Sequence, residues 1–114
     1  MAKDTAIGRD DHIREFKLVE YFNCAPAQLF VILGDIAQWP KLHAPRILVR
    51  KEPTRVQVAF DDATRVNITF DRGEEPGTAQ LTFHHELHQD VAQVRAWRSY
   101  WRQFLKQLRS RVEL

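Results

Sequence analysis

The sequence predicts an α+β fold in which an antiparallel sheet of about five strands packs against one long C-terminal helix. Apolar residues between positions 91 and 112 recur at spacings of three and four, which places them on one helical face. Residues 46–86 instead alternate between apolar and polar side chains, as strands do. The expected order is therefore a strand, two short helices, an antiparallel meander and a long helix.

The N-terminal half supplies the first strand and the short helices. Residues 1–13 are polar, so we expect a mobile tail there and a single domain over residues 14–114. Residues 15–22 are rich in aromatic and branched side chains and predict a strand. Pro26 suits the first turn of a helix that Gly34 ends. A second short helix is expected over residues 35–39, because Pro40 disfavours helix in the residue before it.

Four strands are expected over residues 46–51, 54–60, 64–71 and 78–86. The short gaps between them force antiparallel neighbours, because parallel pairing needs a longer crossover. One face of these strands is apolar and the other is polar, which is typical of a sheet covered on one side only. The apolar face carries Val56, Val58, Phe60, Val66, Ile68, Phe70, Leu81 and Phe83. We expect the long helix to cover it.

The long helix is predicted over residues 90–114. Asp90 stands at the N-cap position with Gln93 three residues later, close to a capping-box pattern. Opposite the apolar face runs a basic stripe of Arg95, Arg98, Arg102, Lys106 and Arg109. The stripe carries no interleaved aromatic residue for base stacking, and the formal net charge is only +2, so we interpret it as the solvated face of a covering helix.

Composition narrows the class of protein. A chain of 114 residues with 44% hydrophobic residues fits one domain with one core. The lone Cys24 excludes an internal disulfide and is interpreted as a small apolar core residue in a reducing compartment. The sequence has neither a bilayer-spanning apolar run nor a signal-peptide core, so we expect a cytoplasmic protein with no membrane partner and no nucleic-acid partner.

Several motifs carry a family resemblance. Ala25-Pro26 followed by Leu29-Phe30, the pair Asp35…Trp39, the hairpin of residues 65–70 and 78–87, and Trp97…Trp101…Leu105…Leu108 occur in the order of the START-like SRPBCC superfamily. Within it, the chain resembles the group of the activator of heat-shock-protein ATPase, over residues 15–113. The resemblance implies a helix-grip fold with an internal hydrophobic cavity. The chain has fewer strands than that family, and Ala44-Pro45-Arg46 replaces its glycine-rich strand, so a shorter sheet encloses less volume.

The histidines are the main candidates for chemistry. His84, His85 and His88 lie close together, and His43 follows the second helix. His84 and His85 must point to opposite faces of a strand, and no HExxH spacing is present, so we expect no metal site. His85 points to the same face of its strand as Leu81 and Phe83 on the apolar side. We interpret it as a hydrogen-bonded core histidine rather than a catalytic one.

Three functions compete at this point. The first is a module that binds a small apolar ligand between sheet and helix. The second is a protein-interaction module, as the resemblance implies. The third is a cyclase- or hydrolase-type enzyme with His85 and Glu20 as acid–base groups. The brevity of the chain favours the second over the first, the lack of convergent polar residues disfavours the third, and no cofactor motif is present. The ligand-binding residues expected for the first are Phe30, Trp39, Val58, Phe60, Ile68, Phe83, His85, Trp97 and Trp101.

A homodimer is the other partner expected. Residues 46–50 are apolar at three successive positions, so both faces of this strand are expected to be covered, and a symmetric copy would do that. The alternative is that Arg46, Arg50 and Lys51 act as gatekeepers at a sheet edge and keep the chain monomeric.

Overall fold

The computed structural model describes residues 14–35, 39 and 44–113, and it has the α+β fold that the sequence predicts. The second helix expected over residues 35–39 and the tail over 1–13 lie largely or wholly outside the described residues. The elements, in chain order, are β2 (Phe16–Phe22), α2 (Pro26–Leu33), β3 (Arg46–Lys51), β4 (Arg55–Ala59), β5 (Arg65–Arg72), β6 (Ala79–Glu86) and α3 (Val91–Val112).

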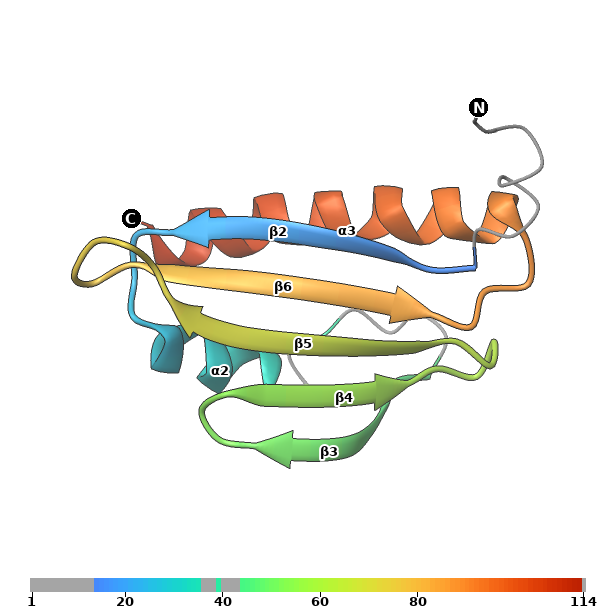
Figure 1. Cartoon of the computed structure of the whole chain (residues 1–114), viewed down its shortest axis with the longest axis horizontal. Coiled ribbons are helices and arrows are strands. Elements are labelled where there is room, and N and C mark those ends of the chain that lie inside the picture. The colour runs from blue at the N-terminus through green and yellow to red at the C-terminus, as the bar shows by residue number, and fades with distance from the viewer. Residues whose placement is uncertain (1–13, 36–38, 40–43, 114) are drawn as a thin grey trace, which may run out of the picture.

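The five strands form one antiparallel sheet in the order β2-β6-β5-β4-β3 (Figure 1). The first strand therefore pairs with the last, with Phe16 opposite His85 and Phe22 opposite Ala79. The other strands follow one another as a meander. As a result, β2 and β3 are the two edge strands of the sheet.

The sheet has one dry face, as predicted. Burial alternates residue by residue along β4, β5 and β6, with the apolar side chains on the buried side. Figure 1 shows α3 running along β2 and β6 behind the sheet, while α2 contacts β5 and β6. The two helices thus share the covering of this face, because α3 alone is too narrow to cover all five strands.

The helix ends agree with the sequence signals. The carboxylate of Asp90 accepts a hydrogen bond from the Gln93 N–H at 2.8 Å and caps α3. Pro26 opens α2, and the Gly34 N–H bonds the Phe30 carbonyl at 2.7 Å where α2 ends. A Cβ at Gly34 would lie 2.8 Å from that carbonyl oxygen, so this position has no room for a side chain.

A bulge in β3 changes which side chains face inward. The pairing with β4 shifts between Ile47 and Val49, so that Arg50 stands opposite the buried Val56. Arg50 then donates to the Gly34 carbonyl at 3.1 Å and covers the ring of Phe30 at 4.9 Å. Leu48 is 42% exposed in the single chain, so its covering by a symmetric copy stays a prediction.

Candidate functional site

The predicted ligand-binding residues come together as a packed core. All of them are buried, with no more than 6% of any residue exposed: Phe30, Trp39, Val58, Phe60, Ile68, Phe83, His85, Trp97 and Trp101. Their rings contact one another, with centroids 4.5 Å apart for Phe60 and Trp97 and 4.8 Å apart for Phe83 and Trp101. These side chains form part of the core between the sheet and α3.

Trp39 belongs to the same core. Its Nε1 donates to the Leu33 carbonyl at 3.1 Å, and its ring meets that of Trp101 edge-on at 5.6 Å. Cys24 is 5% exposed and is a buried core residue, as the sequence indicates. Burial raises the pKa of its thiol, which makes it a poor nucleophile.

His85 is held at both ring nitrogens. Trp101 Nε1–H donates to His85 Nδ1 at 2.8 Å, and His85 Nε2 lies 2.8 Å from Thr64 Oγ1. Thr64 gives its own proton to the Asp62 carboxylate at 2.6 Å, so its oxygen must accept from His85. His85 is therefore neutral with its proton on Nε2, and burial lowers its pKa to about 3. This arrangement stabilises the core and leaves no free ring nitrogen for proton transfer.

Glu20, the second acid–base group expected for an enzyme, does not meet His85. Glu20 on β2 stands opposite Leu81 on β6, and His85 lies four residues further along β6. That separation is about 13 Å along the strand. The register of β2 against β6 therefore keeps these two side chains out of direct contact.

The remaining histidines form no shared site. His84 points to the opposite face from His85, as predicted, and contacts Glu15. His88 is 3% exposed, its ring centroid is 4.4 Å from that of His85, and neither ring nitrogen has a hydrogen-bond partner among the described residues. Burial lowers the pKa of His88. His43 lies outside the described residues, and within them no group of His, Cys, Asp and Glu side chains could hold a metal ion.

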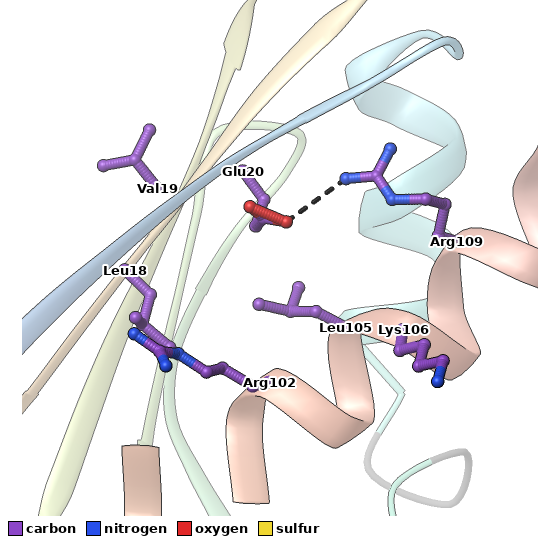
Figure 2. A pocket seen from close by; sticks show the side chains of 7 residues that line it. All are labelled: Leu18, Val19, Glu20, Arg102, Leu105, Lys106 and Arg109. Atoms are coloured by element: carbon purple, nitrogen blue, oxygen red, sulfur yellow. Dashed lines mark hydrogen bonds and ion pairs between the residues drawn. The ribbon is translucent and has the colours of Figure 1, made fainter. Parts of the chain in front are cut away.

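A groove opens at the edge of the sheet. It lies between β2 and α3 and has a volume of about 430 Å³. Figure 2 shows Leu18 and Glu20 on the groove side of β2 and Val19 on its other side. This edge groove is lined by Leu18, Val19, Glu20, Arg102, Leu105, Lys106 and Arg109.

The two ends of the edge groove differ in charge pairing. Arg109 is anchored: it bonds Glu20 at 3.3 Å and Glu113 at 3.0 Å, and its guanidinium covers the ring of Phe22 at 4.5 Å. Arg102 and Lys106 are exposed and make no ion pair with any described residue. The groove therefore offers two cations that no described acidic residue neutralises, beside the apolar side chains of its floor.

The cations of the edge groove belong to a wider basic surface. Helix α3 holds six of the 17 Lys and Arg residues of the chain and none of its 15 Asp and Glu residues. A second hollow of about 370 Å³ lies on the solvent side of α3, lined by Arg95, Arg98, Ser99, Arg102, Gln103 and Lys106. Four residues of the basic stripe are exposed, as predicted, whereas Arg109 is half-buried and ion-paired. The stripe continues into the edge groove through Arg102 and Lys106.

The edge groove was not found from the sequence, although part of its signal was present. In residues 16–22 apolar side chains occur on both faces of the expected strand, so the sequence does not show which face of β2 is inward. Leu18 and Glu20 lie on the same face of β2 as the buried Phe16 and Phe22. A carboxylate at an inward position of a strand, with a cation-rich helix later in the chain, is the pattern that could have indicated this site.

Comparison with protein-family models, with curated proteins and with solved structures finds no match for this chain. The resemblance to START-like proteins therefore stays a prediction that rests on the motifs quoted above. None of the helices in the described ranges combines the length and apolar character that crossing a membrane requires.

Proposed function

We propose that this protein is a protein-interaction module that binds an acidic, partly apolar segment of a partner protein in the edge groove. The observation that carries the proposal is the pair of cations Arg102 and Lys106. They form no ion pair with a described residue, and they lie beside the apolar Leu18 and Leu105 in an opening of about 430 Å³. Carboxylates of the segment would meet the cations, and its apolar side chains would cover apolar residues that β2 exposes.

The charge distribution supports an acidic partner. Because α3 carries cations and no acidic residue, its field attracts anionic surfaces over a distance set by the ionic strength. Arg109 is already neutralised by Glu20 and Glu113, so the attraction centres on Arg102 and Lys106. Such pairs raise the association rate and select against basic partners.

The packing of the interior supports a surface site over an internal one. A ligand between sheet and helix would have to displace contacts such as that between Phe83 and Trp101, whose ring centroids are 4.8 Å apart. Trp101 is also bonded to His85. The edge groove needs no such displacement, because it is already open.

A second candidate is a small amphipathic anion in the same groove. The volume of about 430 Å³ favours it, because ligand pockets typically span about 300–1,000 Å³. This candidate keeps the apolar ligand expected from the sequence but moves it from the interior to the sheet edge. The enzyme alternative is not proposed, because His85 and Glu20 are held apart.

The test is a binding titration with synthetic probes. A peptide of about ten residues with alternating Glu and Val, long enough to span β2, is expected to bind, and its counterpart with Lys in place of Glu is not. The double variant Arg102→Gln/Lys106→Gln should weaken binding by about tenfold, because two exposed charge pairs contribute about 0.2–1 kcal/mol each.

The matched control removes two charges at the opposite edge of the sheet. Lys51 and Arg55 are exposed cations that face each other across β3 and β4. Lys51→Gln/Arg55→Gln should leave the affinity for the Glu/Val peptide unchanged. Equal losses in both double variants would show a nonspecific charge effect and refute the groove. Binding of decanoate but of no peptide would favour the second candidate.

A further inference from the structure

The outer edge of β2 is open among the described residues. The strand has seven residues, contains no proline, and pairs with β6 in an unbroken register from Phe16 to Phe22. On its other side no described strand follows. Alternate backbone N–H and C=O groups of β2 therefore point away from the sheet, where another strand could accept and donate hydrogen bonds.

The other edge strand is protected in the way that edges of natural sheets usually are. The bulge in β3 interrupts its pairing pattern, and Arg46, Arg50 and Lys51 lie along six residues. Bulges and cations discourage the addition of a further strand. In contrast, β2 has an unbroken register and a single cation, Lys17, and it exposes Val19 and Tyr21.

Side chains on both faces of β2 fit an added strand. Leu18 and Glu20 point into the edge groove. On the outer face, Val19 is 42% exposed and Tyr21 is 61% exposed. A strand beside β2 would place alternate side chains in the groove, near Arg102, and the others beside Val19 and Tyr21. The two exposed apolar residues would then be covered by neighbours on the added strand.

We infer that the partner segment binds as an extended strand added to the free edge of β2. This inference rests on the proposed function and specifies its geometry. The segment alternates, with acidic side chains on the groove face, toward Arg102 and Lys106, and apolar side chains on the outer face, toward Val19 and Tyr21. Backbone hydrogen bonds to β2 supply affinity, and the alternating side chains supply specificity.

Charge favours such a segment over a second copy of this chain at the same edge. Antiparallel pairing of two β2 strands about a two-fold axis places both α3 helices on the same face of the joined sheet. Their cation-rich flanks, including Arg102 and Lys106, would then approach each other without intervening acids from α3. Like charges in that position repel, whereas an acidic segment is attracted.

The experiment uses the full chain and three forms of the alternating Glu/Val peptide. One form is unmodified, one is N-methylated on its Glu residues, and one is N-methylated on its Val residues. In an extended strand, alternate N–H groups point to the same edge, so only one methylated form removes the donors that face β2. We expect the affinity of one methylated form to fall at least about tenfold, and the affinity of the other to stay close to that of the unmodified peptide.

Amide hydrogen exchange gives a second readout of the same geometry. Alternate amides within residues 17–21 should gain protection when the unmodified peptide binds. If the unmodified peptide binds but both methylated forms weaken equally and β2 gains no alternating protection, strand addition is wrong while the proposed function stands. If the unmodified peptide does not bind at all, the proposed function fails, and this inference fails with it.

Discussion

Trp101 on α3 allows the packing account to be tested by a graded pair of substitutions. Its side chain is 0% exposed, contacts the rings of Phe83 and Trp39, and donates to His85 Nδ1 at 2.8 Å. Trp101→Ala removes both the ring and the donor. Trp101→Phe keeps a six-membered aromatic ring and removes the donor with the rest of the indole. The two variants therefore separate the contribution of packing from that of the hydrogen bond.

The expected losses follow from these contacts. Truncating a buried indole costs about 3–5 kcal/mol, and leaving a buried acceptor such as His85 Nδ1 without a partner costs about 1–3 kcal/mol. Trp101→Ala should then lose about 4–8 kcal/mol, a large part of the about 5–15 kcal/mol typical of a domain. Trp101→Phe should lose about 1–3 kcal/mol, mostly from the stranded acceptor.

Urea unfolding followed by far-ultraviolet circular dichroism measures both free energies of unfolding. Tyr21→Ala serves as the control, because this aromatic residue is 61% exposed and its removal should change stability by no more than about 0.5 kcal/mol. A loss below about 1 kcal/mol for Trp101→Ala would show that the indole does not anchor α3 to the sheet. If the Trp101→Phe variant is as stable as the native chain, the hydrogen bond to His85 contributes nothing to the free energy of unfolding.

Three further outcomes are expected. The free energy of unfolding should fall by about 2 kcal/mol or more between pH 7 and pH 5, because His85 is protonated below about pH 6.5 in the unfolded chain but stays neutral in the folded one, where its pKa is about 3. Burial of His88 lowers its pKa and acts in the same direction. Urea midpoints that do not change with pH would contradict this prediction. Arg98→Gln/Arg102→Gln should unfold within about 1 kcal/mol of the native chain, and salt-dependent binding of a mixed RNA or DNA pool by the native chain but not by this variant would contradict the solvated-face interpretation. Sedimentation at micromolar concentration should give the 13.4 kDa of a monomer, because the bulge and cations of β3 favour the gatekeeper alternative, whereas twice that mass would support the homodimer.

The sheet and the long helix were predictable because their signals are local. Val56 and Val58 on β4, and the matching positions on β5 and β6, alternate without interruption, so only one face could be buried. Asp90 caps α3 where the apolar spacing begins. In both cases the residues that determine the structure lie within a few positions of one another in the sequence.

The edge groove was not predictable because it depends on long-range pairing and on a local irregularity. Glu20 and Arg109 meet only because the first strand joins the last one and α3 crosses behind them. No alternation pattern specifies that strand order. Likewise, the bulge beside Leu48 turns Arg50 inward, and a period of two predicts the opposite face for it.

The most direct test of the binding site is to locate it on the protein by nuclear magnetic resonance. Titration of the labelled chain with the alternating Glu/Val peptide should shift backbone amide signals mainly in residues 17–21 of β2 and 102–109 of α3. Signals of β3, at the opposite edge of the sheet, should stay in place. Shifts that centre on the core around Phe83 and Trp101, or on β3, would contradict the edge groove as the site.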